Sequence, residues 1–322
     1  MKTFFVICGL FTVYAAFAAP IYESSFKNDA VGKEIFHQYS KRPVMREADG
    51  KAVVFIPGGS IGRSRKFDVK PGARILVRAR AKNAAKSCSL EGNPAWEGLL
   101  TQRGVKGMKA LNTGGALVFP VFFDEAGKLR RMPPHQSTYQ RRIYSSEWKE
   151  YVMEFFVPGN CTGMALWFSG GASANGLELA SFSAEEVQDA PTLNINPELK
   201  LENLEIRGIE RYINTQIDEG PDGRAELSFP QGNILTCRFP VRPNTKLRIV
   251  AETRKNSQGC RMFVEFQDKD GKRCGSLKDH VTVRKAEDTR METDIGVPAE
   301  AATCHVLIRF GSLTGLWVTE EK

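Results

Sequence analysis

The residues best suited to hold a ligand lie in two segments. Trp96 sits in an irregular stretch from Lys86 to Gly115, where it either contacts a ligand or anchors the loop. A basic aromatic segment follows, made of Tyr139, Arg141, Arg142 and Tyr144. Aromatic rings stack on the apolar faces of sugars, and guanidinium groups bind hydroxyl or anionic groups. Both segments are therefore candidate sugar-binding sites.

The other tryptophans lie in apolar runs. Trp148 precedes Tyr151 and Phe155, which predicts a core position. Trp317 follows Leu316 near the C-terminus and is also expected to be packed. Trp167 lies between two apolar residues, so it is either a core residue or the wall of a groove.

Catalytic motifs are missing from the sequence. The histidines are not at metal-ligand spacings, no Gly-x-Ser-x-Gly elbow occurs, and no glycine-rich phosphate loop precedes a helix. Glycosidic hydrolysis needs two carboxylates at a defined separation, which a sequence cannot show. We therefore expect a protein that is not an enzyme.

The N-terminus predicts export. Lys2 precedes an apolar run from Phe4 to Ala19, and Ala16-Phe17-Ala18 has the small-x-small pattern of a signal-peptidase site. We expect residues 1–18 to be a signal peptide that is removed. As a membrane anchor the run is too short, since a bilayer core requires roughly 20 apolar residues. The mature chain is expected to be secreted or periplasmic, without a membrane span.

The net charge is +8 at pH 7, with basic residues scattered along the chain. A solvated surface explains this pattern, although it leaves a preference for anionic glycans open. The isoelectric point near 9.1 would suit nucleic acid, but the export signal argues against that partner.

The chain contains an internal repeat. Four blocks recur in the same order: 50–61 with 223–234, 67–83 with 239–256, 121–128 with 264–272, and 157–170 with 297–312. This order indicates a tandem duplication. We place the two units at residues 19–190 and 191–322, with a proline-containing linker near 190–197.

Each unit reads as short strands separated by turns. Apolar residues from Ile75 to Ala81 alternate with more polar ones, as in a half-buried strand. Residues 124–127 and 268–271 are typical of hairpins, and no long window has helical periodicity. The sequence therefore predicts an all-β protein with a two-sheet sandwich in each unit.

These motifs resemble a known family. The segment 67–72, Phe-Asp-Val-Lys-Pro-Gly, the later Asp-Gly hairpin, and the run from Glu147 to Phe168 are similar to carbohydrate-binding modules of the bacterial cellulose- and xylan-binding type, families 4, 9 and 22. The resemblance covers most of 50–187 and, more weakly, 223–318. It implies two tandem jelly-roll domains of the galactose-binding-domain-like fold and noncovalent binding of oligo- or polysaccharides.

Members of this family often hold a structural calcium. The segments that close the two units, 177–183 and 315–320, lack the aspartate that can serve it. The resemblance therefore leaves the metal unknown, and we expect no other cofactor.

The resemblance also implies a disulfide scheme. Without Cys8, six cysteines remain, an even number that favours disulfides in an exported chain. Cys88 and Cys260 each follow one strand, and Cys161 and Cys304 each precede a later strand that such jelly rolls are expected to place beside it. The implied bonds are Cys88–Cys161 and Cys260–Cys304. Cys237 and Cys274 remain, as a third pair or as free thiols.

Three functions follow from these observations. The leading one is a secreted, noncatalytic protein that binds oligo- or polysaccharides. A second is a structural or cell-surface adhesion protein that uses the same sandwiches for protein contacts. The third is a small glycosidase or polysaccharide lyase built on the sandwich itself.

Overall fold

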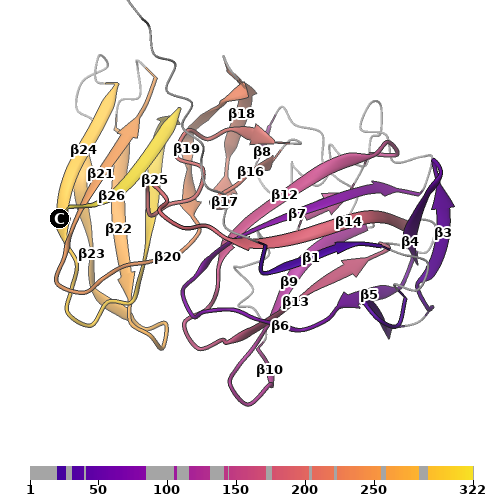
Figure 1. Cartoon of the computed structure of the whole chain (residues 1–322). Coiled ribbons are helices and arrows are strands. Elements are labelled where there is room, and N and C mark those ends of the chain that lie inside the picture. The colour runs from indigo at the N-terminus through magenta and orange to yellow at the C-terminus, as the bar shows by residue number, and fades with distance from the viewer. Residues whose placement is uncertain are drawn as a thin grey trace, which may run out of the picture.

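The computed structural model describes residues 20–26, 31–39, 41–84, 105–106, 116–130, 141–143, 145–171, 176–202, 205–220, 223–254, 259–282 and 289–321. Two β-sandwiches lie side by side in Figure 1. The predicted all-β class and tandem jelly-roll sandwiches are therefore confirmed. None of the described residues forms a helix long and apolar enough to cross a membrane. The predicted signal peptide, residues 1–18, lies outside the described residues.

The first sandwich contains most of the strands before residue 190. They are β1 (Tyr22–Ser25), β2 (Ile35–Tyr39), β3 (Val44–Ala48), β4 (Lys51–Pro57), β5 (Ile61–Ser64), β6 (Phe67–Asp68), β7 (Arg74–Asn83), β9 (Ala116–Phe123), β10 (Leu129–Arg130), β11 (Arg141–Ile143), β12 (Lys149–Phe156), β13 (Gly163–Ser169) and β14 (Gly176–Glu186). Sheet A has the order β12-β7-β14-β4-β3, with β1 beside β14. Sheet B has the order β10-β9-β13-β5-β2, with β11 beside β9 and β6 beside β13.

The second sandwich is built from later strands. They are β15 (Leu201–Glu202), β16 (Glu205–Ile206), β17 (Ile209–Ile213), β18 (Thr215–Glu219), β19 (Ala225–Thr236), β20 (Phe239–Pro240), β21 (Lys246–Glu252), β22 (Arg261–Gln267), β23 (Arg273–Thr282), β24 (Arg290–Gly296), β25 (Thr303–Leu313) and β26 (Gly315–Glu321). Sheet C has the order β23-β22-β25-β19-β18-β8, where β8 is Val105–Lys106 of the first unit, and β17 and β20 pair with β19 and β25. Sheet D has the order β24-β21-β26, and β15 pairs with β16. The predicted division at 190/191 falls between β14 and β15 and stays a prediction.

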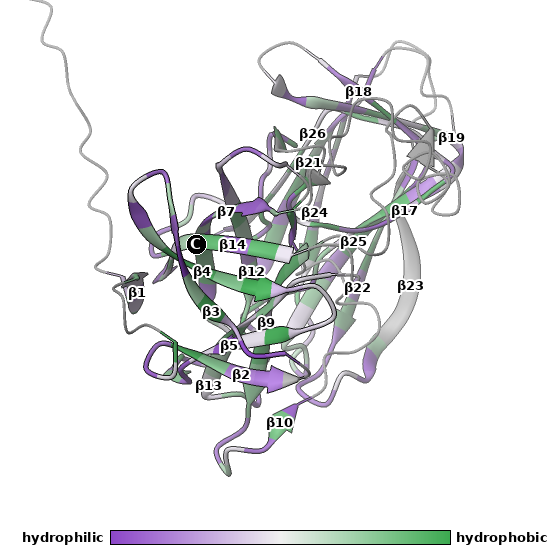
Figure 2. Cartoon of the chain, turned by 90° about the vertical axis from the view of Figure 1, so that its right-hand side faces the viewer, coloured by the Kyte–Doolittle hydropathy of each residue, from purple (hydrophilic) through white to green (hydrophobic). Residues whose placement is uncertain are grey.

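Alternation along the strands separates the core from the surface. In β7, burial alternates at almost every residue, and Ile75, Val77, Ala79 and Ala81 all point into the first core. Because successive strand side chains point to opposite faces, the residues between them must face outward. Figure 2 shows green, hydrophobic stretches along the strands and purple, hydrophilic colour in many of the turns.

Equivalent turns confirm the two predicted hairpins. The backbone N–H groups of Lys128 and Lys272 each donate, over 2.8 Å, to the Oδ1 of the aspartate four residues earlier. Gly72 and Asn244 likewise share a positive φ, and their N–H groups bond the carbonyls of Val157 and Val297. The repeated sequence blocks therefore form the same local structures in both sandwiches.

The long insertion of the first unit reaches the second sandwich. Its strand β8 (Val105–Lys106) pairs in parallel with β18, at Thr215 and Gln216. Backbone pairing at the edge of sheet C thus joins the two units.

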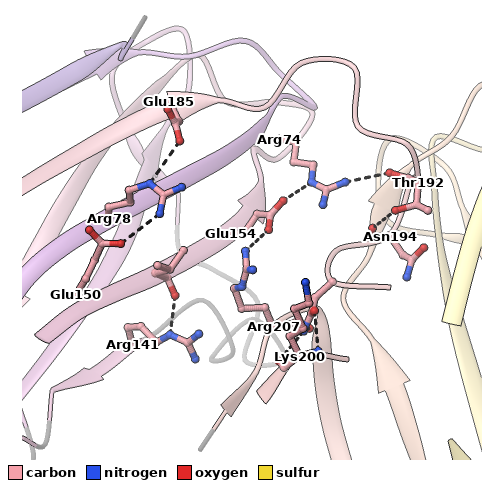
Figure 3. A network of polar contacts seen from close by, with 12 residues as sticks. Arg74, Arg78, Arg141, Glu150, Glu154, Glu185, Thr192, Asn194, Lys200 and Arg207 are labelled. Atoms are coloured by element: carbon pink, nitrogen blue, oxygen red, sulfur yellow. Dashed lines mark hydrogen bonds and ion pairs between the residues drawn. The ribbon is translucent and has the colours of Figure 1, made fainter. Parts of the chain in front are cut away.

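A buried carboxylate also connects the sandwiches (Figure 3). Glu154 of β12 accepts a hydrogen bond from Nε of Arg74 at 2.5 Å and pairs with Nη1 of Arg207 from the second unit. Only 7% of the Glu154 side chain is exposed. Arg74 also donates through Nη1 to the carbonyl of Thr192 at 3.0 Å, in the segment between the sandwiches. Cys237 of the second unit packs against the first core.

The Cys260–Cys304 disulfide predicted from the resemblance is wrong. Both thiols are free and buried. In the antiparallel pair of β22 and β25, Cys304 lies opposite Phe266, six residues from Cys260, a distance of about 20 Å along the strand. A disulfide requires Cα atoms within about 7 Å.

The error has a topological cause. The strands assumed to be neighbours, β7 with β13 and β21 with β25, belong to opposite sheets in each sandwich. The cysteines are also not equivalent, because Cys161 and Ala301, not Cys304, make matching backbone bonds to Pro158 and Pro298. Cys161 carries a free, buried thiol, while its implied partner Cys88 lies outside the described residues.

The structure predicts free thiols at Cys161, Cys260, Cys274 and Cys304. After unfolding in guanidinium without reductant, alkylation and peptide mapping should find all four cysteines labelled. In the native protein Cys260 should react slowly, because burial raises the pKa of its thiol to about 12. Detection of a peptide linked through Cys260 and Cys304 would contradict the structure.

Replacing the carboxylate between the sandwiches should be costly. Glu154→Gln leaves two arginine charges without their partner, and we expect the unfolding free energy to fall by about 3–5 kcal/mol. Glu150→Gln is the matched control in the same strand, where 59% of the side chain is exposed and the loss should be below about 1 kcal/mol. Urea denaturation measures both, and equal losses would refute the connecting role of Glu154.

Candidate functional site

The two outer faces of the first sandwich differ in chemistry. On sheet A the outward side chains neutralise one another: Arg78 pairs with Glu150 at 3.3 Å and with Glu185 at 3.7 Å, and Lys82 pairs with Glu178 at 3.1 Å (Figure 3 shows the first two pairs). Because these charged groups already pair with one another, few of them are available to bind a ligand. The outer face of sheet A is therefore a weaker candidate for a binding site than that of sheet B.

Sheet B carries a row of aromatic and cationic side chains. Phe119 of β9 lies opposite Trp167 of β13, Trp167 opposite Arg63 of β5, and Arg63 opposite Phe36 of β2. Residues directly opposite one another in a sheet point to the same face, so all four share the outer face. All four are half-buried. We call them the aromatic row.

The aromatic row is a continuous surface. The ring centroids of Phe119 and Trp167 are 5.8 Å apart at an interplanar angle of 56°. Cζ of Arg63 lies 6.0 Å from the Phe36 ring centroid. The Nε of Arg63 is buried and has no hydrogen-bond partner among the described residues. Three inter-strand spacings of about 4.8 Å give the row a length of about 14 Å.

The residues around the aromatic row form an apolar cluster, and a lysine beside that cluster adds a positive charge. Val121, Phe123 and Ala165 form a small cluster with Phe119 and Trp167 on the same face. Outside the row, Nζ of Lys66 lies 5.3 Å from the Phe123 ring centroid. Among the described outward residues of β2, β5, β9 and β13, none is a carboxylate. The face can therefore stack on an apolar ring and donate hydrogen bonds to its substituents.

The structure separates the two predicted arginines. Arg142 lies opposite Leu117 and so belongs to the outer face of sheet B. Arg141 points the other way, is 5% exposed, and donates from Nε to the carbonyl of Val152 at 2.7 Å (Figure 3). Arg141 thus bridges the two sheets, which is a structural position. Trp96, Tyr139 and Tyr144 lie outside the described residues.

Sequence reasoning identified only part of the aromatic row. For Trp167 the sequence does not decide between core and groove, because both of its neighbours, Leu166 and Phe168, are apolar. Both neighbours are buried in the structure. Phe36 and Phe119 were missed, although Phe119 lies between the buried Val118 and Pro120 and Phe36 follows the buried Ile35. Trp148, expected in the core, is half-buried and donates from Nε1 to Asp49 at 2.7 Å.

The described residues contain no cluster of three His, Cys, Asp or Glu that could hold a metal ion.

The second sandwich has lost the aromatic row. At the equivalent positions of sheet C, Phe263 lies opposite Leu307, Leu307 opposite Leu235, and Leu235 opposite Arg211. The first three are nearly buried and form their own apolar cluster. The same face of the two sandwiches therefore presents different chemistry.

A charged group lies beside this apolar cluster. The carboxylate of Glu265 accepts from Arg238 at 3.2 Å, and it lies 3.5 Å from Nε of Arg273 and 3.3 Å from Nε2 of His305. Burial opposes the ionisation of Glu265, but the hydrogen bond from Arg238 and the nearby positive charges hold its pKa below the usual value.

Two further groups have opposite pKa shifts. Burial, followed by the charge of Arg238, lowers the pKa of His305 to about 4, even though Glu265 favours its charged form. Burial raises the pKa of Glu210 to about 7, against the attraction of Arg238 and Arg211. At pH 6 the folded protein therefore holds His305 neutral and Glu210 protonated.

Comparison with known proteins gives structural likenesses only. No protein-family model and no curated protein matches the sequence. The chain is similar to the CBM22-1–CBM22-2 tandem domain from Paenibacillus barcinonensis Xyn10C, at 11% identity and a TM-score of 0.36, over 95% of this chain and 99% of that one. It is also similar to the tandem CBM51 modules of Sp3GH98, a family 98 glycoside hydrolase from Streptococcus pneumoniae, at 11% identity and a TM-score of 0.20, over 94% and 97%.

A viral structure resembles the chain as well. The similarity to Sulfolobus Turreted Icosahedral Virus has 11% identity and a TM-score of 0.33, over 90% of this chain and 61% of that one. Tandem carbohydrate-binding modules are thus among the structures that the chain resembles. Likenesses at these identities and TM-scores carry no functional conclusion, so function must be argued from the side chains themselves.

The two shifted groups predict opposite pH effects on stability. Between about pH 4.3 and 6.5 the unfolded chain protonates His305 but not Glu210, whereas the folded chain does the reverse, so their contributions cancel. In His305→Gln only the Glu210 effect remains, and stability relative to wild type should fall as pH rises. In Glu210→Gln only the His305 effect remains, and relative stability should rise.

Each slope should reach at most about 1.4 kcal/mol per pH unit, the value for one proton. Urea denaturation at pH 4.5, 5.5 and 6.5 measures the slopes as differences from wild type, which removes the contributions of all other groups. Variant curves parallel to that of wild type would contradict both pKa shifts.

Proposed function

We propose that the protein is a secreted, noncatalytic carbohydrate-binding protein whose first sandwich binds an oligo- or polysaccharide chain across the aromatic row. The observation that carries this proposal is the row itself: Phe119, Trp167, Arg63 and Phe36 follow one another across four paired strands. Sugar rings stack their C–H faces on aromatic rings, and Arg63 supplies a donor for the hydroxyls between the rings.

The length of the row favours a chain of sugars as the ligand. A row of about 14 Å is longer than one pyranose ring, so neighbouring sugars can contact Trp167 and Phe36 at the same time. Arg63 and Arg142 also place guanidinium groups on this face, and these can donate hydrogen bonds to the hydroxyls of neutral sugars. Export through residues 1–18 would deliver the protein to the compartment where polysaccharides occur.

A noncatalytic role is supported by the charges on this face. Glycoside hydrolysis canonically uses a pair of carboxylates flanking the scissile bond. Near the row the described part of sheet B offers one exposed carboxylate, Asp68, which lies opposite Gly163 at the far end of β13. One carboxylate at the end of the sheet does not form the required pair.

Substitution of the aromatic row tests the proposal. A glycan array and calorimetric titration of the mature protein, with cellohexaose and xylohexaose as soluble probes, should detect binding. Trp167→Ala or Phe119→Ala should weaken that binding about tenfold or more, because a large apolar side chain contributes about 1.5–3 kcal/mol when it is buried. Thermal melts check that each variant is folded.

Two control variants locate the site. Trp148→Ala removes the same residue type from the edge of the opposite sheet and should leave the affinity unchanged. Trp96→Ala tests the insertion, and a loss confined to this variant would move the site away from sheet B. No glycan bound at millimolar concentration would favour the structural or adhesion role instead.

A further inference from the structure

The outer face of sheet C in the second sandwich carries a concentration of arginines. Outward positions of β17, β22 and β25, together with two flanking residues, supply Arg211, Arg238, Arg261, Arg273 and Arg309. Among the side chains that the structure describes, the carboxylates beside these arginines are Glu265 and Glu210. Arginine is charged at all ordinary pH values, so this face is positive. We call it the basic face.

Buried polar atoms without a partner gather on the basic face. Nε of Arg309, Nη1 of Arg238, Oδ1 of Asn233 and Nδ1 of His305 have no hydrogen-bond partner in the described part of the chain. The His305 side chain is only 8% exposed, so water does not supply the hydrogen bond that its Nδ1 atom lacks. Buried polar atoms are nearly always paired in folded proteins, so several unpaired ones at one place indicate a missing partner.

The chemistry of these atoms specifies a ligand. Nε2 of His305 faces the carboxylate of Glu265 at 3.3 Å, so the neutral imidazole carries its proton there and presents Nδ1 as an acceptor. The amide oxygen of Asn233 is a second acceptor, while the guanidinium atoms of Arg238 and Arg309 are charged donors. A matching ligand has an anionic acceptor group together with hydroxyl donors. An acidic sugar has both.

The spacing indicates more than one sugar unit. His305 and Arg309 lie four residues apart in β25, which corresponds to about 13 Å along the strand. The nearly buried Leu235, Phe263 and Leu307 separate these two polar ends. A ligand that reaches both ends must therefore be a chain.

Backbone strain marks one end of the basic face. Phe310, next to Arg309, has a positive φ of 55° in the middle of β25, and its side chain is 42% exposed. Bulky residues rarely adopt this conformation, and strained residues cluster at ligand sites.

We propose that the basic face of the second sandwich binds an acidic polysaccharide, a chain whose sugars carry carboxylate or sulfate groups. This site is separate from the aromatic row, and its existence does not depend on sugar binding by the first sandwich. The protein thereby has two polysaccharide-binding faces of different specificity.

Direct binding with charge-matched probes tests the proposal. Titration of the full mature chain with a galacturonic acid hexamer, a sulfated dextran fragment and neutral xylohexaose compares carboxylate, sulfate and uncharged chains. We expect at least one anionic chain to bind, with an affinity that falls as salt is raised. The double variant Arg211→Gln/Arg309→Gln should weaken that binding at least tenfold and leave xylohexaose binding unchanged.

Two controls keep the outcomes distinct. Arg290→Gln removes an exposed arginine from sheet D and should change nothing, while Trp167→Ala should reduce xylohexaose binding but not anionic binding. Thermal melts verify folding.

The proposal is overturned if neither anionic chain binds at millimolar concentration, or if Arg290→Gln weakens binding as much as the double variant. It is also overturned if a single-stranded DNA oligonucleotide of equal charge binds as tightly and is lost in the same variant, since that result would show unspecific attraction to positive charge.

Discussion

The two-residue period of the β-strand is the constraint on which this structure depends. Every strand that gives one face to a core gives the other to the surface, so the outward residues of neighbouring strands fall into rows. In the first sandwich one such row contains Phe119, Trp167, Arg63 and Phe36. Because these residues do not build the core, their types are free to serve a ligand without loss of the fold.

The same constraint explains how the two sandwiches differ. Their inward residues remain mostly apolar, and equivalent turns at Asp124 and Asp268 keep the same hydrogen bonds. The outward positions have diverged, from Trp167 to Leu307 and from Arg63 to Leu235, while charged residues such as Glu265 and His305 appear nearby. Duplication thus preserved the scaffold and released one face of each copy for separate use.

Much of the fold was predictable from the sequence, because strands and turns are encoded locally. The alternation from Ile75 to Ala81 indicated β7, and the Asp-Gly turns indicated hairpins. Strand pairing was not predictable in the same way, since it depends on contacts between distant segments. The disulfide scheme failed for this reason: Cys260 and Cys304 lie about 20 Å apart along paired strands, measured from their register.

The candidate site was likewise predictable only where local sequence determines it, and not where it depends on strand pairing. Local alternation could not decide the direction of Trp167, because Leu166, Trp167 and Phe168 are all apolar, and only pairing with Phe119 and Arg63 settles it. The two predicted arginines, Arg141 and Arg142, lie side by side in β11, but alternation sends them to opposite sides of the sheet.

The parallel pairing of β8 with β18 has a consequence for the evolution of the chain. An unpaired edge strand is a template for aggregation or for pairing with another molecule. Here residues 105–106 of the first unit cover the β18 edge of the second. Loss or exchange of one unit alone would expose the backbone groups of Thr215 and Gln216 at an edge open to unwanted pairing, which favours inheritance of the two units together.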